Sequence, residues 1–155
     1  MNLKLLKNNL TPEEAREIDK AVDIFVEESK MGGNHKGAVQ QTVENIGASI
    51  YKGGNGYNGD FLAAFTDDGK LASYALCSLS KDIDNKLTYW ILQSYIAKPY
   101  RHTPKTKEWW DVLENRAKSL FAKHIVLMAS RRPEAYQKLL GNGWEPYATL
   151  IKKDI

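Results

Sequence analysis

The stretch from Leu87 to Ala97 constrains the fold more than any other part of the chain. It is rich in aromatic and β-branched residues and is largely apolar on both faces that a strand would present. Such a strand usually lies inside its sheet, with both faces covered. A helical pattern over Thr106–Ala122 follows, and then a short apolar run over His124–Ala129. This order predicts two parallel strands joined by a right-handed crossover.

The remaining elements place this unit in an α/β fold. Thr11-Pro12-Glu13-Glu14 has the N-cap hydroxyl, early proline and following Glu that start a helix. Spacing and turn residues predict further helices at Lys36–Tyr51 and Pro133–Leu140, and strands at Leu3–Leu6, Phe61–Phe65, Leu71–Leu79 and Trp144–Ile151. We therefore expect the order β-α-α-β-β-β-α-β-α-β, with Pro146 able to divide the last strand. The sheet should be mixed, mostly antiparallel and twisted, with a parallel βαβ centre.

Length and composition exclude several protein classes. The 155 residues, 43% hydrophobic and 26% charged, predict one globular domain over residues 1–155. No apolar run reaches the roughly 18–20 residues of a membrane helix, and the N-terminus lacks a signal-peptide core. Cys77 is the single cysteine and the three histidines are far apart. We therefore expect a cytoplasmic protein without a membrane or metal site.

Charge is distributed unevenly along the chain. Residues 1–80 carry a net −3 and residues 81–155 a net +6, which together give the formal +3. The basic half favours an anionic partner. A nucleic-acid-binding protein is an alternative that rests only on this basic half and on Trp109-Trp110. Because the net charge is small, the sequence disfavours nucleic acid as the partner.

Two motifs in the second half of the chain resemble those of a known superfamily. Tyr95-Ile96-Ala97-Lys98-Pro99-Tyr100-Arg101 is similar to the end of the fourth strand in the GNAT superfamily of acetyl-CoA-dependent N-acetyltransferases. Arg132-Pro133-Glu134-Ala135, with Gly143-Trp144, resembles the superfamily's Asn-Pro-x-Ala and Gly-Phe ending. The order of elements resembles the same fold over nearly the whole chain.

The resemblance implies where acetyl-CoA would bind. In this superfamily the fourth and fifth strands diverge, the pantetheine arm bonds to exposed strand backbone, and the pyrophosphate rests on the next helix N-terminus. The divergence would lie near Ala97, facing Met128–Ser130, with Ile96 and Ala97 backbone aligning the thioester. The implied cofactor-binding residues are Tyr95, Ile96, Ala97, Arg101, His102, Lys105, Thr106 and Lys107.

The presumed phosphate loop departs from the superfamily pattern Gln/Arg-x-x-Gly-x-Gly/Ala. Arg101 matches the first position, but Pro104 and Thr106 replace the two glycines. Proline donates no N–H and fixes its own φ, so one phosphate donor is lost. Lys98, Lys105 and Lys107 could hold phosphates through their side chains instead. The alternative is an ordinary solvated basic loop.

The catalytic groups depart from the pattern as well. Acetyl transfer to an amine needs a base for the ammonium and an acid for the leaving thiolate. The strand carboxylate that many members carry is absent here, and Gln93 cannot act as a base. Leu139 stands where many members place a Tyr acid, so Tyr136, three residues earlier on the same helical face, is the candidate acid. The alternative is that Tyr136 packs or faces solvent; His35, His102 and His124 are the other titratable candidates.

Two classes of function follow. The first is an acetyl-CoA-dependent N-acetyltransferase in which an amine of an unknown small molecule or protein attacks the thioester directly. The second is a catalytically inactive GNAT-like fold that serves as a binding or structural subunit of a larger assembly, including a viral particle. Either could be a homo- or hetero-oligomer, and the sequence identifies no acceptor.

Overall fold

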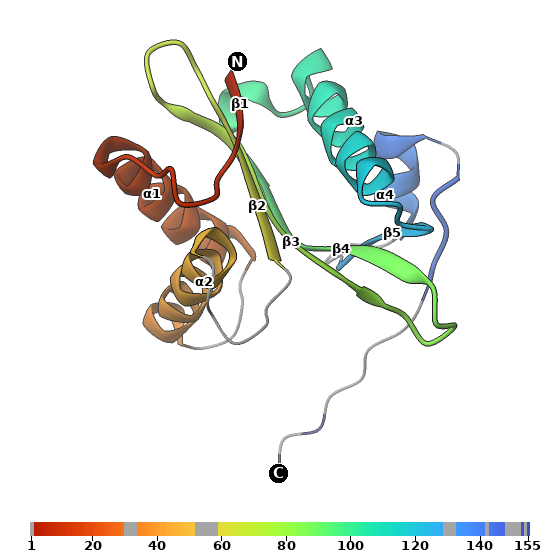
Figure 1. Cartoon of the computed structure of the whole chain (residues 1–155). Helices are drawn as coiled ribbons and strands as arrows, with labels where there is room; N and C mark the ends of the chain where they lie inside the picture. Colours follow the sequence, from red (N-terminus) through yellow and green to blue (C-terminus); the bar gives the residue numbers. More distant parts are fainter. Residues whose placement is uncertain are drawn as a thin grey trace.

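The computed structural model describes residues 2–29, 34–51, 59–128, 133–141, 143–147, 153 and 155. It is a five-stranded sheet in the order β1-β2-β3-β4-β5, with helices on both faces (Figure 1). The elements are β1 (Asn2–Leu5), α1 (Pro12–Ser29), α2 (His35–Ile50), β2 (Gly59–Phe65), β3 (Leu71–Lys81), β4 (Leu87–Ile96), the 3-10 turn η1 (Lys98–Tyr100), α3 (Pro104–Ser119), β5 (His124–Leu127) and α4 (Pro133–Leu140).

The predicted strand-helix-strand unit is confirmed. β1, β2, β3 and β4 pair antiparallel in turn, and β5 pairs parallel to β4 after the crossover through α3. In Figure 1, α1 and α2 lie on one side of the sheet, whereas α3 and α4 lie on the other. The α/β class and the mixed sheet are therefore as the sequence predicted.

Two apolar clusters fill the space between the helices and the sheet. The cluster beneath α1 and α2 contains Ile18, Val22, Val26, Ile46, Ile50, Phe61, Tyr74, Leu76 and Tyr95. The cluster beneath α3 contains Ala75, Cys77, Tyr89, Ile91, Trp109, Leu113 and Ala117. Successive strand residues point to opposite faces. Consequently β3 is buried at seven consecutive positions, because both of its faces are covered.

The helix starts follow from local sequence. Thr11 and Glu14 form a reciprocal capping box: the Glu14 N–H donates to Thr11 Oγ1 at 3.2 Å, and the Thr11 N–H donates to Glu14 Oε2 at 3.0 Å. α3 begins at Pro104, two residues earlier than predicted, because proline suits the first helical turn, where its missing N–H would have no acceptor.

The predicted closing strand is not seen in the part that the structure describes. Residues 144–147 carry no strand, and Ala148–Ile151 lie outside the described residues. Trp144 instead packs edge-on against Trp110 of α3, with ring centroids 6.3 Å apart. Tyr147 packs against Trp90 of β4 at 6.2 Å. Among the described helices, none is both long and apolar enough to cross a membrane.

Candidate functional site

Among the described residues, β4 pairs with β3 along its whole length but with β5 over only its first half. Its parallel ladder with β5 ends at the pair Ile91 and Leu127, followed by one hydrogen bond from the Met128 N–H to the Ile91 carbonyl at 3.1 Å. β4 continues to Ile96 and stays paired with β3. Within the described residues, the segment Leu92–Ile96 therefore has an open edge on the side of β5.

A β-bulge in β4 lies where the described ladder with β5 ends. β3 pairs Leu76 with Gln93 and the next residue, Cys77, with Ile91, so Leu92 is an extra residue in β4. A bulge bends its strand and increases the local twist. The sequence predicts divergence near Ala97; the described ladder ends at Ile91, and the divergence itself stays a prediction. Opposite, Met128 is described, whereas Ala129 and Ser130 lie outside the described residues.

The backbone groups on the open edge follow from the antiparallel pairing with β3. The Ala97 N–H donates to the Ala72 carbonyl at 2.9 Å, so the Ala97 amide faces β3. Residues alternate in an antiparallel ladder. Tyr95 therefore also faces β3 with its backbone, whereas Ser94 and Ile96 present theirs to the open edge. The Tyr95 ring is buried and stacks on Tyr74 with centroids 5.5 Å apart.

Arg101 lies at the end of this edge and points toward α1. Its Nε donates to the Ile96 carbonyl at 2.6 Å, and its two terminal nitrogens bond to the Glu28 carboxylate at 2.7 and 3.3 Å. The guanidinium also lies 5.7 Å from the centre of the Tyr95 ring. The structure thus joins Arg101 to a carboxylate that sequence reasoning had not connected with it.

The N-terminus of α3 offers few backbone donors. Pro104 has no N–H, and the Thr106 N–H donates to the Thr103 carbonyl at 3.0 Å. The hydroxyls of Thr103 and Thr106 both donate to the Tyr100 carbonyl, at 2.7 and 3.0 Å. In the first turn, the Lys105 N–H has no acceptor among the described residues. It and the helix dipole remain available to an anion.

The basic side chains of this turn are exposed, and two of them are paired with acids. Lys105 Nζ bonds to Glu108 at 3.1 Å, and Lys107 Nζ bonds to Asp111 at 2.7 Å. The Asp111 carboxylate raises the pKa of Lys107 through this bond. His102 is exposed and has a φ of 58°, the left-handed region that side chains seldom occupy. Their role in holding a cofactor stays a prediction.

The candidate acid and bases are scattered. Tyr136 is half-buried on α4 and has no hydrogen-bond partner in the part of the chain that the structure describes; the side chain of Leu139 is outside that part. His35 pairs with Asp23 at 2.8 Å at the start of α2. His124 is exposed at the start of β5. The structure brings none of the three into hydrogen-bond contact with Arg101 or the α3 turn.

Gln93 is held in a polar bridge between the sheet and α2. Tyr74 donates its hydroxyl to Gln93 Oε1 at 3.3 Å, and Gln93 Nε2 donates to Thr42 Oγ1 at 3.1 Å. Both partners are buried. The amide donates and accepts at once, which a carboxylate could not do. The glutamine therefore serves to fasten α2 to β4.

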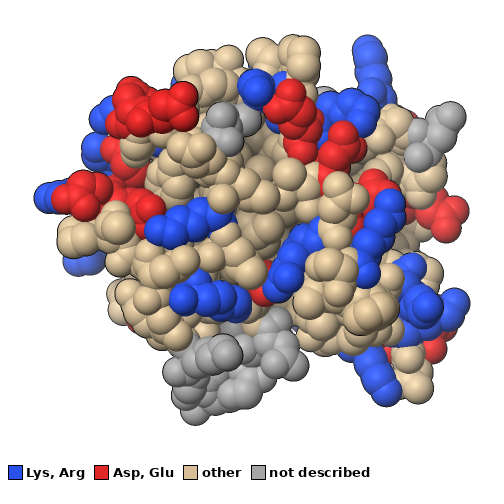
Figure 2. Space-filling view, turned by 45° about the horizontal axis from the view of Figure 1, so that its top comes forward, with Lys and Arg blue, Asp and Glu red and all other residues tan. Residues whose placement is uncertain are grey.

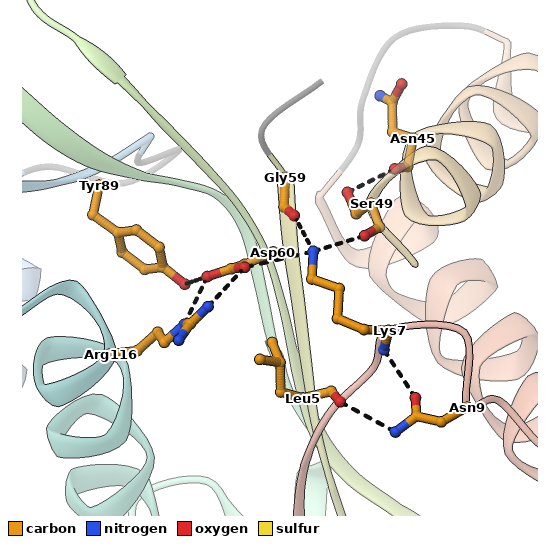
Figure 3. Close-up of polar contacts among 9 residues, drawn as sticks. All are labelled: Leu5, Lys7, Asn9, Asn45, Ser49, Gly59, Asp60, Tyr89 and Arg116. Atoms are coloured by element: carbon orange, nitrogen blue, oxygen red, sulfur yellow. Dashed lines mark hydrogen bonds and ion pairs between the residues drawn. The ribbon is translucent and has the colours of Figure 1, made fainter. Parts of the chain in front are cut away.

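A partly buried ionic cluster, which sequence reasoning missed, surrounds Asp60 on β2 (Figure 3). Asp60 on β2 accepts from Arg116 of α3 at 2.8 and 3.2 Å and from the Tyr89 hydroxyl at 3.2 Å. Lys7 Nζ lies 3.6 Å from the same carboxylate and also donates to the carbonyls of Ser49, at 2.9 Å, and Gly59. The sequence feature that could have revealed this cluster is Asp60, an acidic residue at the start of an apolar strand.

The cluster has a structural role. Burial raises the pKa of Tyr89, with Cys77 and Asp60 adding to the effect, so the phenol stays protonated and can donate. Through Asp60 the cluster joins β2 to α3 directly and to α2 by way of Lys7. Among the described residues, no group of three or more His, Cys, Asp or Glu could hold a metal ion.

Surface charge and the tryptophans bear on the nucleic-acid alternative. On the face shown in Figure 2, basic and acidic side chains are interspersed. Trp109 is buried and donates its indole N–H to Ser94 Oγ at 3.2 Å. Trp110 packs on Trp144. Both rings are thus used within the fold.

Comparisons with known proteins identify the fold. No protein-family model and no curated protein matches the chain. Among solved structures, a Pyrococcus furiosus protein named as a candidate acetyl transferase aligns with a TM-score of 0.73 and 17% identity, over 99% of this chain and 100% of that one. An aminoglycoside antibiotic 6'-N-acetyltransferase of Acinetobacter haemolyticus aligns at 0.66 and 13%, over 100% and 99%.

A third solved structure is the ribosomal-protein-alanine N-acetyltransferase of Brucella melitensis, with a TM-score of 0.60 and 16% identity over 97% of this chain and 100% of that one. A GNAT family acetyltransferase of Staphylococcus aureus is similar at 0.65 and 14%, over 99% and 98%. The alignments span whole chains, so the likeness covers the complete order of elements.

Proposed function

We propose that this chain, which has the fold of the GNAT acetyltransferases, transfers an acetyl group from acetyl-CoA to an amine. The observation that carries the proposal is the edge of β4 after the bulge at Leu92, which has no β5 partner among the described residues and leads through η1 to the basic first turn of α3. An extended ligand with amides along its arm and phosphates at its end suits this arrangement. The amides can pair with the unpaired strand edge, and the phosphates can rest on the helix N-terminus.

The residues present fit such a cofactor in part. The backbone of Ser94 and Ile96 can pair with the amides of the arm, as an added strand would. The Lys105 N–H, the dipole of α3 and the Lys105 and Lys107 side chains can hold phosphate oxygens. Pro104 removes one donor, so binding through Lys side chains replaces part of the usual backbone cradle.

The transfer step makes clear demands on the protein. The amine nitrogen must form a bond to the thioester carbon as the carbon–sulfur bond breaks, the amine must lose a proton, and the sulfur must gain one. Acetyl-CoA supplies the activated acyl group. Tyr136 is our candidate proton donor because its hydroxyl has no partner among the described residues. Since Gln93 cannot take a proton, we expect the amine to react in its neutral form.

The acceptor is not decided by the fold. The two neighbours whose names give an acceptor differ completely: one name refers to an aminoglycoside antibiotic and the other to an alanine of a ribosomal protein. We therefore propose only that the acceptor is an amine.

A second candidate function is a non-catalytic binding or structural subunit. Two observations favour it: the amide of Gln93 replaces a carboxylate and is fastened between Thr42 and Tyr74, and Arg101 is already bonded to Glu28. Such a subunit would act as a homo- or hetero-oligomer. The cytoplasmic location expected from the sequence stays a prediction under both candidates.

Calorimetric titration with acetyl-CoA tests the first candidate. A ligand that binds only the folded chain also raises its melting temperature. We expect heat of binding and a higher melting temperature, both reduced in Lys105→Ala and Lys107→Ala but not in Lys118→Ala, which alters a lysine at the other end of α3. Absence of binding at millimolar acetyl-CoA would refute the proposal. Binding without thiol release across a panel of primary amines would favour the second candidate.

A further inference from the structure

Arg101 is hydrogen-bonded to the Ile96 carbonyl, an acceptor that an added strand would also use. The Ile96 carbonyl faces the open edge, and Arg101 Nε bonds to it at 2.6 Å. An extended ligand that pairs with this edge must donate an N–H to the same oxygen. The Arg101 side chain and the ligand therefore compete for the last acceptor on the edge.

The same guanidinium is held by a carboxylate of α1. Arg101 bonds to Glu28 at 2.7 and 3.3 Å, and the two side chains are 32% and 34% exposed. Lys98 Nζ lies 3.9 Å from the same carboxylate. An ion pair exposed to this degree is screened by water and contributes little to stability. A stronger anion can therefore replace Glu28 without disrupting the core.

We propose that the Glu28–Arg101 pair is a latch on the open edge of β4, which a phosphate-bearing ligand opens by exchanging one anion for another. The ligand's phosphate takes the place of the Glu28 carboxylate on the guanidinium, and the Ile96 carbonyl becomes available to the ligand's amide. This inference rests on the proposed function, because it assumes that coenzyme A binds at this edge. No covalent bond changes in the exchange.

The exchange would also change the charge of a neighbouring hollow. Glu27, Glu28, Ile24 and Lys98 line an open hollow of about 420 Å³ beside the latch. Moving the Arg101 cation away from Glu28 makes this hollow more negative, which favours a positively charged group of the acceptor. Binding of coenzyme A should therefore strengthen the binding of an amine there, and the reverse coupling must be equal.

Titration of coenzyme A into Glu28→Gln tests the latch. The neutral amide weakens the hold on Arg101, so we expect the dissociation constant for coenzyme A to fall about three- to fivefold relative to the wild-type chain. Glu27→Gln is the matched control, because it removes the same charge from the same helix end and the same hollow. Glu27 makes no ion pair with the described residues, so its substitution should leave affinity within about twofold.

The double variant Glu28→Gln/Arg101→Ala separates the latch from a general charge effect. If released Arg101 holds the phosphate, removing it should abolish the gain. Equal affinities of Glu28→Gln and Glu27→Gln, or weaker binding by Glu28→Gln alone, would overturn the latch while the proposed function stands. Failure of the wild-type chain and every folded variant to bind would overturn both.

Discussion

The carboxylate of Asp60 on β2 accepts two hydrogen bonds from the guanidinium of Arg116 on α3, at 2.8 and 3.2 Å. This contact fastens α3 to the sheet at the end opposite its N-terminal turn. Because Lys105 and Lys107 lie on that turn, the Asp60–Arg116 bond helps to set where the candidate phosphate site stands relative to the open edge of β4.

Replacement of Asp60 by Ala should destabilise the protein strongly. Its side chain is only 11% exposed, and its loss leaves Arg116 and the Tyr89 hydroxyl without their acceptor. Breaking such a pair from one side costs about 3 kcal/mol. Urea unfolding measures the change. The control is Asp111→Ala, whose carboxylate pairs with Lys107 on the exposed side of α3 and should cost about 0.5 kcal/mol or less. Equal costs would contradict the structural role of the cluster.

Stability should decrease with acid because of Glu17. The hydrogen bond from Lys20 lowers its pKa below the ordinary 4.5, partial burial opposes this, and the N–H of Leu71 adds to the lowering. A carboxyl whose folded pKa is depressed contributes stability that is present above its unfolded pKa and lost as pH falls through its folded pKa. Urea unfolding between pH 2 and 6 should show a loss below about pH 4.5. Glu17→Gln and Lys20→Met should each flatten this loss; an unchanged slope would refute the assignment.

Cys77 should be chemically inert in the folded chain. It is fully buried, and burial raises the pKa of its thiol to about 12, with the neighbouring Tyr89 side chain opposing the shift. Thiolate is the reactive form, so almost none is present at pH 8. Reaction with a disulfide reagent should be slow in buffer and fast in denaturing urea. Fast reaction of the native chain would show that the β3 region opens locally.

Replacement of Gln93 by Leu should cost stability by removing the bridge between α2 and the sheet. Tyr74 and Thr42 are buried and would lose partners, at a cost of about 2 kcal/mol. Equilibrium unfolding measures it. Gln40→Leu is the control, because Gln40 is exposed on α2 and bonds only to Glu44 of the same helix. A double-mutant cycle with Tyr74→Phe should show coupling; additive effects would mean that the two groups do not interact.

Replacement of Phe121 by Gly should stabilise the protein. Phe121 has a φ of 60° at the end of α3, and its side chain is 82% exposed. A bulky residue in the left-handed region costs roughly 1 kcal/mol, which glycine avoids. We expect the melting temperature to rise by about 3 °C. Asn85→Gly, at a φ of 60°, should gain less because asparagine tolerates this region. A lower melting temperature for Phe121→Gly would show that the phenyl ring makes a stabilising contact.

The candidate site was predictable in position but not in detail. The resemblance placed Arg101, Lys105 and Thr106 at the junction between β4 and α3, and the structure has them there. The direction of the Arg101 side chain was not predictable, because its partner Glu28 lies 73 residues earlier in the chain. The bulge at Leu92 was hidden as well, since an extra residue in a strand that is apolar on both faces leaves its hydrophobic pattern unchanged.

The sequence by itself determined the order of elements as far as α4, the parallel β4-α3-β5 unit, the capping box at Thr11 and Glu14, and the burial of both sheet faces. These depend on neighbouring residues and on the periodicity of apolar side chains, which are local properties. Only the tertiary structure decided that Asp60 meets Arg116, that Glu28 holds Arg101 and that β4 bulges at Leu92. Charged side chains are long and choose partners by distance in space, and a strand's register is set by its neighbours.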